Sequence, residues 1–274
     1  MSDSRFTPQL RKEIATFLIL TFALSSIFYY ILGTAKTLGL GGGRYVLMLM
    51  WCPGVSALIT RLLYQRNVRG EGWRAGAPRW LVLAYTLPIA YALVAYGLVW
   101  LSGSGGVDLS RFHTPIWRFV LLGSVMSLIS ALGEELGWRG FLVPKLYQGW
   151  SFARTALVSG AIWASWHMPL IIAADYNGGT PTWYSITCFA IMVLGIGFAF
   201  AWIRLRSGSV WAAAILHASH NLYIQGFFDV ITVDKGITKY LVSEFGAALA
   251  LVAIIVGYIF WRLRNQLPDA TPGA

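Results

Sequence analysis

Long apolar runs separated by short polar and basic segments make up most of the chain. A hydrocarbon core about 30 Å thick requires roughly 20 apolar residues per helix, and eight segments meet that requirement. We predict helices over Ile14–Ala35, Tyr45–Tyr64, Trp80–Leu101, Ile116–Val143, Phe152–Ala173, Trp183–Ile203, Val210–Phe228 and Val242–Trp261. The pattern predicts an all-α, polytopic membrane helix bundle with about eight transmembrane helices.

The composition agrees with this fold class. Of the 274 residues, 57% are hydrophobic and only 12% are charged, whereas soluble domains carry about 25% charged residues. The chain also contains 13 tryptophans, a residue enriched where membrane proteins meet the lipid headgroups. We therefore expect an integral membrane protein with the lipid bilayer as its immediate partner.

The positions of the 21 basic residues predict the orientation. With the N-terminus inside, fifteen of them fall in inner segments, and the six in outer segments are Lys36, Arg44, Arg111, Arg118, Lys235 and Lys239. This asymmetry favours an even number of spans with both termini cytoplasmic, as in a bacterial inner (plasma) membrane. The net charge of +10 is spread in short clusters between apolar runs, which argues against a nucleic-acid partner.

No soluble domain interrupts the pattern, so residues 1–274 are predicted to form a single integral membrane domain. The tail, residues 265–274, is predicted to be disordered. The basic segment Arg66–Arg79 (RNVRGEGWRAGAPR) is interpreted as an orientation determinant near anionic lipid. Cys52 and Cys188 lie in apolar runs without metal-ligand spacing, so we interpret them as packing residues.

Three charged residues interrupt the fourth predicted span. A charge at the centre of a membrane helix costs roughly 2.5–3.5 kcal/mol on insertion scales, so it requires a partner, a water-filled cavity or a function. Glu135 and Arg139 are spaced i,i+4 in the favourable order for a helical ion pair. Glu134 is rotated by about 100° from Glu135 and has no local basic partner. We predict a structural role for Glu135 and a free carboxylate at Glu134.

Two other spans carry polar residues at helical spacing. The fifth contains WASWH, which places Trp163 and His167 on one face, and the seventh contains HASHN, which does the same for His217 and Asn221. A buried histidine alone is often a packing residue, and an asparagine often joins two helices. Polar residues on three separate helices favour a shared cavity with Glu134.

The residue types leave two chemical routes open. Glu134, His167 and His217 match the two-histidine, one-carboxylate ligands of a catalytic Zn²⁺ that retains an open position for water. Without a metal, Glu134 would act as the general base on water while histidine and asparagine stabilise the oxyanion. Both routes hydrolyse a peptide bond, and the absence of HExxH excludes an ordinary zincin.

A serine mechanism is disfavoured. A Ser–His pair on two helices is conceivable, but no candidate lies in a G-x-S-x-G turn, and the glutamates would be left unexplained. The candidates are Ser159, Ser165, Ser209 and Ser219.

The three motifs together resemble a known family. EELGWR (residues 134–139), WASWH (163–167) and HASHN (217–221), in this order, are similar to those of the CAAX-protease and bacteriocin-processing family of intramembrane proteases, also called the CPBP or Abi family. The resemblance covers roughly residues 120–225, the expected catalytic core. It implies an eight-helix fold with a membrane-enclosed cavity, and an intramembrane endopeptidase that acts on a membrane-associated protein or peptide, including lipidated CaaX-like substrates.

The resemblance also implies residue roles. Glu134 would activate water with help from His167, and His217 and Asn221 would hold the oxyanion. Glu135 and Arg139 would support the site, with or without a metal. The family's second motif usually begins with Phe, and Trp163 would retain its aromatic wall. His220 is an extra histidine to which the resemblance assigns no role; it is either a partner that supports His217 or, as we favour, a packing residue.

Two alternatives to a protease remain. One is a non-catalytic membrane scaffold or immunity protein that retains the polar site for binding. The other is a proton-coupled transporter, in which buried Glu and His relay protons; the chain lacks the inverted repeat typical of many carriers.

Overall fold

The predicted helix bundle is present in the computed structural model, which describes residues 6–35 and 43–269. Within these ranges, seven helices are long and apolar enough to cross a membrane. They are α1 (Pro8–Ala35), α2 (Gly43–Gln65), α3 (Pro78–Leu101), the rod Ile116–Tyr147, α7 (Phe152–Ala173), α8 (Thr182–Ser207) and α11 (Ala247–Arg262) with its extension to Gln266. The all-α membrane fold is confirmed.

The seventh predicted span also forms a helix, although it is not among these seven. It consists of α9 (Val210–Tyr223), the π-helical segment η5 (Ile224–Phe228) and α10 (Asp229–Ile231). This helix carries two histidines and an asparagine between positions 217 and 221. These polar residues lower the apolar character of this helix.

Short elements complete the chain between the long helices. A two-stranded antiparallel pair joins β1 (Gly106–Val107) to β2 (Thr232–Val233), with Gly106 opposite Val233. The 3₁₀ turns are η1 (Arg69–Glu71), η2 (Leu109–Arg111), η6 (Thr238–Tyr240) and η7 (Leu263–Gln266). Tyr147 Oη donates a hydrogen bond to the backbone oxygen of Pro268 at 3.0 Å, and residues 270–274 of the predicted tail lie outside the described residues.

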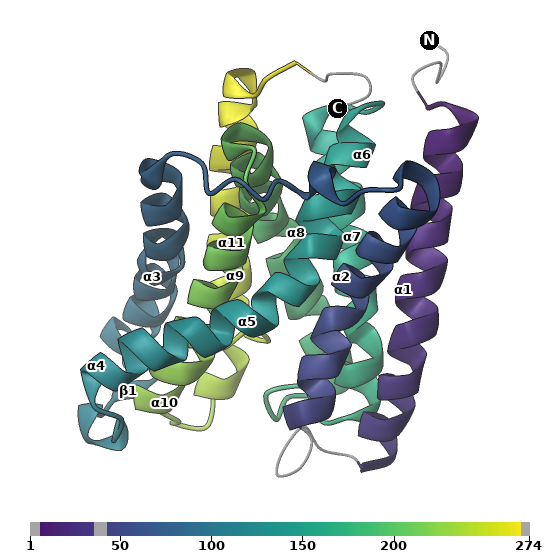
Figure 1. Ribbon diagram of the computed structural model, residues 1–274. Coiled ribbons are helices and arrows are strands. Elements are labelled where there is room, and N and C mark those ends of the chain that lie inside the picture. Colours follow the sequence, from purple (N-terminus) through teal and green to yellow (C-terminus); the bar gives the residue numbers. More distant parts are fainter. Residues whose placement is uncertain (1–5, 36–42, 270–274) are drawn as a thin grey trace.

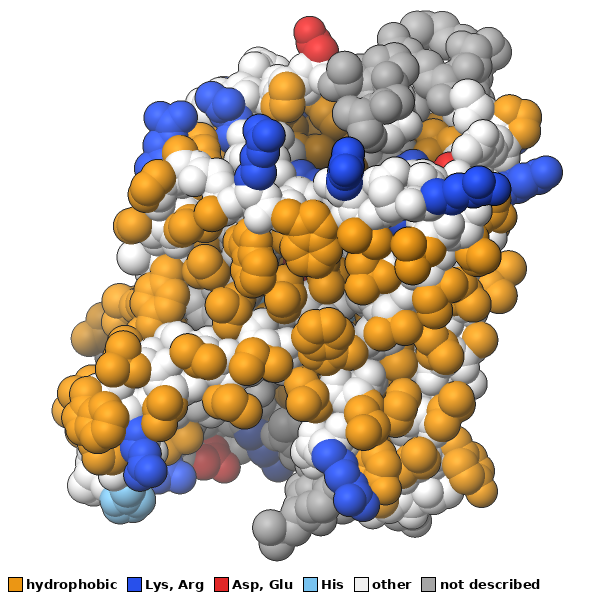
Figure 2. All heavy atoms as spheres, viewed as in Figure 1, with side chains coloured by type: hydrophobic (Ala, Val, Ile, Leu, Met, Phe, Trp, Pro, Cys, Tyr) orange, Lys and Arg blue, Asp and Glu red, His pale blue; other side chains and the backbone are white. Residues whose placement is uncertain are grey.

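The surface has the banding expected of a membrane protein. Figure 2 shows a broad hydrophobic band across the face in view, with Lys and Arg side chains above and below it. The first residue of α1 and the last of α11 lie at the same end of the bundle (Figure 1), as an even number of crossings requires. Which end faces the cytoplasm stays a prediction.

The fourth span is a single rod built from five segments. These are α4 (Ile116–Arg118), η3 (Phe119–Gly123), α5 (Ser124–Glu135), η4 (Leu136–Leu142) and α6 (Val143–Tyr147). The segments η3 and η4 are π-helical, a geometry that is frequent at functional sites. The π segment η4 begins directly after Glu135, and α5 runs obliquely across the bundle (Figure 1).

Glycines, which lack a side chain, allow α2 to pack closely against this rod. A Cβ on Gly54 would lie 2.5 Å from the backbone oxygen of Gly133, and one on Gly137 would lie 2.4 Å from Cβ of Pro53. Gly133 and Gly137 are four residues apart, so they form the small-residue stripe that allows membrane helices to approach closely. This contact fixes the rod on both sides of the two adjacent glutamates.

We expect Gly137→Ala to destabilise the protein by about 1–3 kcal/mol, because the added methyl group overpacks a rigid backbone contact. Thermal unfolding of the detergent-solubilised protein measures the loss. The control is Gly97→Ala in α3, where an added Cβ meets no atom within 4 Å and the higher helix propensity of alanine is favourable. Equal melting temperatures for the two variants would contradict the proposed close contact.

The basic segment Arg66–Arg79 also takes part in the packing of the bundle. Glu71 from this segment is fully buried and forms an ion pair with Arg61 of α2. Arg204 of α8 donates to the backbone oxygen of Glu71 at 3.4 Å, and Arg61 donates to that of Gly140 in η4 at 3.4 Å. The segment therefore packs into the end of the bundle and ties three elements together.

Candidate functional site

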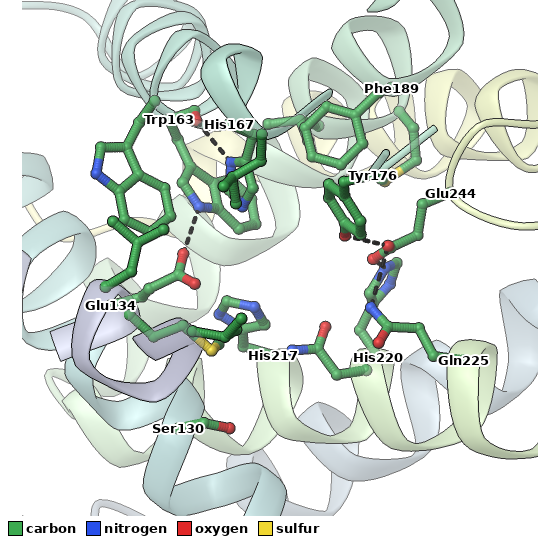
Figure 3. Close-up of a pocket in the computed structure, with 18 of the residues that line it drawn as sticks. Ser130, Glu134, Trp163, His167, Tyr176, Phe189, His217, His220, Gln225 and Glu244 are labelled. Carbon is green, nitrogen blue, oxygen red and sulfur yellow. Dashed lines mark hydrogen bonds and ion pairs between the residues drawn. The ribbon is translucent and has the colours of Figure 1, made fainter. Parts of the chain in front are cut away.

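A cavity of about 400 Å³ lies inside the bundle. Residues of α2, α5, α7, α8, α9 and the loop before α11 line it, and its wall is largely apolar and aromatic. The structure brings all four predicted catalytic residues to this cavity, namely Glu134, His167, His217 and Asn221. Figure 3 shows Glu134, His167 and His217 around one side of the open space.

Glu135 forms the predicted ion pair and is also bonded to a histidine. Arg139 Nη1 donates to Glu135 Oε1 at 2.8 Å, and His217 Nδ1 lies 2.9 Å from the same oxygen. The guanidinium carbon of Arg139 lies 4.0 Å from the ring centre of Trp163 and 4.3 Å from that of Phe200. Glu135 thus fixes His217 while its own charge is compensated, and it is not a cavity-lining residue.

Glu134 faces the cavity and has no Lys or Arg partner among the described residues. Its Oε2 accepts a hydrogen bond from Trp163 Nε1 at 2.8 Å, and the residue is 1% exposed. The sequence predicted only an aromatic wall at Trp163, yet the indole N–H also orients the carboxylate. Figure 3 shows the carboxyl group of Glu134 directed into the cavity beside His217.

Hydrogen bonds fix both histidine rings. His167 Nδ1 lies 2.9 Å from the backbone oxygen of Trp163, so this nitrogen must carry the proton that it donates. His217 Nδ1 donates in the same way to Glu135. When neutral, each ring therefore retains Nε2 as an unprotonated acceptor for proton transfer. Within the described ranges the side-chain amide of Asn221 makes no hydrogen bond, which leaves it available to a ligand.

The cavity does not contain a preformed metal site. Glu134, His167 and His217 offer suitable donor types for Zn²⁺. However, no three His, Cys, Asp or Glu side chains in the described part of the chain are grouped so that they could hold a metal ion. We therefore derive no catalytic step through a metal.

A second polar cluster was not predicted. His220 also lines the cavity: its Nδ1 lies 2.5 Å from Tyr91 Oη and its Nε2 lies 3.0 Å from Glu244 Oε1. These hydrogen bonds favour the alternative that His220 is a partner of other cavity residues, and its role stays a prediction. Tyr176 and Gln225 donate to Glu244 Oε2 at 2.5 and 3.0 Å. The signal in the sequence was an acidic residue, Glu244, inside the last predicted span.

We expect Trp163→Phe to lower kcat by roughly 10–100-fold, the value of a hydrogen bond to a charged group. Phenylalanine retains an aromatic ring beneath Arg139 but cannot donate to Glu134. The melting temperature should change little, and KM should stay close to that of the wild type. Steady-state kinetics of peptide cleavage measure kcat and KM separately. An unchanged kcat would show that the indole N–H does not position Glu134.

Comparisons with known proteins match the central part of the chain. Residues 116–223 match the family model described as type II CAAX prenyl endopeptidase Rce1-like. A curated relative, CAAX prenyl protease 2 of Methanococcus maripaludis, is 29% identical over 126 residues, which cover 43% of this chain and 43% of the relative. The chain thus matches less than half the length of that relative. The matched family segment contains all three motifs, from Glu134 to Asn221.

Proposed function

We propose that the chain is an intramembrane endopeptidase of the CAAX-protease (CPBP) family, because residues 116–223 match the model of type II CAAX prenyl endopeptidases. It hydrolyses a peptide bond in a membrane-associated protein or peptide. One observation carries the proposal: Glu134 is buried at the cavity wall, has no Lys or Arg partner within residues 6–35 and 43–269, and lies beside His167 and His217, whose Nδ1 atoms are fixed elsewhere. A buried carboxylate of this kind is costly unless it is used.

The reaction proposed is attack by activated water. Glu134 removes a proton from a water molecule as the water oxygen bonds to the carbonyl carbon of the substrate, and His167 Nε2 orients that water. Asn221 donates to the oxyanion, as does protonated His217 with Glu135 as its counter-ion. The proton held by Glu134 then passes to the amide nitrogen, the C–N bond breaks, and an amine and a carboxylic acid leave.

The proposed substrate class rests on the residues that line the cavity and on the name of the matched relative. The cavity wall is mostly apolar, which suits a peptide that already resides in the bilayer. The matched relative is named a CAAX prenyl protease, and by analogy a lipidated C-terminal segment is the first candidate. The proposal includes a bacterial inner-membrane location with both termini cytoplasmic, supported by the distribution of basic residues.

Cleavage of a defined peptide library by the purified protein tests the proposal. The library contains matched lipidated and unlipidated membrane peptides, mass spectrometry identifies the products, and protein lacking the Glu134 carboxylate is the blank. We expect Glu134-dependent products. If a folded sample gives none, the scaffold or proton-carrier interpretation replaces the protease.

A chelator distinguishes the two routes to activated water. Cleavage that persists in the chelator supports the carboxylate mechanism. Cleavage that stops, and returns when Zn²⁺ is added back, assigns Glu134, His167 and His217 as ligands that converge only when the metal binds.

A further inference from the structure

The buried acidic residues fall into two groups. In the described part of the chain five glutamates are buried, at positions 13, 71, 134, 135 and 244. Three of them form ion pairs with Lys or Arg: Glu13 with Lys145, Glu71 with Arg61, and Glu135 with Arg139. The other two, Glu134 and Glu244, have no such partner, and these two are the ones that line the cavity.

Glu244 is held by donors from three parts of the chain. Tyr176, in the loop between α7 and α8, donates to Oε2 at 2.5 Å, and Gln225 of η5 donates to the same oxygen at 3.0 Å. His220 of α9 contacts Oε1 and is itself bonded to Tyr91 of α3. Figure 3 shows this group across the cavity from Glu134. The carboxylate is therefore oriented by its neighbours.

Among the described residues the ionisable partner of Glu244 is His220, which carries a positive charge only when it is protonated. A carboxylate offers about four lone-pair sites, and three are occupied by Tyr176, Gln225 and His220. No Lys or Arg in the described ranges lies within ion-pair distance, whereas the three glutamates away from the cavity all have one. The remaining site thus suits a cation that arrives with a ligand, since a charge-assisted hydrogen bond is about twice as strong as a neutral one.

We propose that Glu244 binds a Lys or Arg side chain of the peptide substrate. This inference rests on the proposed endopeptidase function, because it assigns a binding role to the cavity in which Glu134 would act. It makes the enzyme selective for peptides with a basic residue near the scissile bond.

The spacing along α9 limits where that basic residue lies. His220 of α9 and Gln225 of η5, which continues from α9, follow His217 by three and eight residues. At 1.5 Å per residue they lie about 5–12 Å further along the axis. An extended peptide advances about 3.3 Å per residue, so the basic residue lies about one to four positions from the bond that is cut.

Paired peptides that differ only in a lysine or a glutamine test this inference. The lysine is placed in turn at each of the four positions on either side of the cleavage site. For the wild type we expect kcat/KM to be roughly 10–100-fold higher with lysine at one of these positions, the value of a hydrogen bond between charged groups. Glu244→Gln should remove this preference, because kcat/KM falls much more for the lysine peptide than for the glutamine peptide.

Matched variants separate binding from folding. Asp234→Asn removes an exposed acidic charge that is outside the cavity lining, and it should retain the lysine preference. Gln225→Ala retains the Glu244 charge but removes one orienting donor, so the preference should weaken several-fold even if Glu244→Gln does not fold. Equal cleavage of the lysine and glutamine peptides by the wild type, or an equal loss on both peptides in Glu244→Gln, would overturn the proposal.

A binding measurement distinguishes this proposal from the proposed function. In a Glu134→Gln background, the dissociation constants of the paired peptides are measured by the quenching of tryptophan fluorescence. A tighter constant for the lysine peptide that disappears when Glu244→Gln is added supports the cation site even if no variant cleaves. Equal constants reject the site even if the wild type is an active protease.

Discussion

Glu134→Gln is expected to lower the rate of peptide cleavage by roughly 10²–10⁴-fold, the usual contribution of a general base, and to leave the fold intact. The amide has nearly the same shape, and its oxygen can still accept the hydrogen bond from Trp163. It cannot remove a proton from water. Because Glu134 has no Lys or Arg partner in the described part of the chain, the substitution leaves no buried cation unpaired. Initial rates on the best library peptide measure the loss, and thermal unfolding measures the stability.

A cavity-lining residue outside the proposed chemistry supplies the control. Ser130 lines the same cavity, but within the described residues its hydroxyl donates only to the backbone oxygens of Met126 and Ser127 in its own helix. Ser130→Ala should therefore cleave at close to the wild-type rate. If Glu134→Gln retained more than about a tenth of the wild-type rate, its carboxylate could not be the general base.

The sequence predicted the membrane helices well because length and apolarity decide them. The helix that begins at Val210 was also predicted, although two histidines and an asparagine lower its apolar character and it is not among the seven long apolar helices. A bundle shields those residues from lipid by turning them toward a cavity, so function and apolarity compete in this helix. The i,i+4 spacing of Glu135 and Arg139 was enough to predict their ion pair, because both residues lie on one helix.

Contacts between distant segments could not be read from the sequence. Glu244 lies just before α11, and its three partners belong to α9, η5 and the loop after α7. Nothing in local spacing relates these segments. The same holds for Glu71, which belongs to a basic segment between two helices and forms a buried ion pair with Arg61. The hydrogen bond from Trp163 to Glu134 likewise depends on how two helices pack.

The π-helical segments also could not be predicted from the sequence. The rod that holds Glu134 changes to π geometry at Leu136, although the residues in both parts have similar apolar character. Such a change inserts extra backbone into a turn and redirects the side chains that follow, and it is frequent at functional sites. Here it lies between Glu135 and its partner Arg139. The fine geometry of the site therefore depends on tertiary packing.

Arg139→Ala is expected to lower the free energy of unfolding by about 3–5 kcal/mol, the cost of removing one partner of a buried ion pair. Glu135 would keep its contact with His217 but lose its permanent counter-charge. The contacts of the guanidinium with the rings of Trp163 and Phe200 would also be lost. SDS titration of the detergent-solubilised protein measures the change, and the yield of folded protein should fall in parallel.

Two variants make the Arg139 prediction specific. Arg154→Ala removes an exposed arginine that lies 4.2 Å from the ring centre of Trp150, and it should change stability by no more than about 0.5 kcal/mol. Adding Glu135→Gln to Arg139→Ala should restore part of the lost stability, because no uncompensated charge then remains buried. A double variant no more stable than Arg139→Ala alone would show that ring packing, and not the stranded charge of Glu135, dominates. With Glu134→Gln inactive but stable, and Arg139→Ala unstable, the two adjacent glutamates would have separate roles, one in the chemistry and one in holding His217 in place.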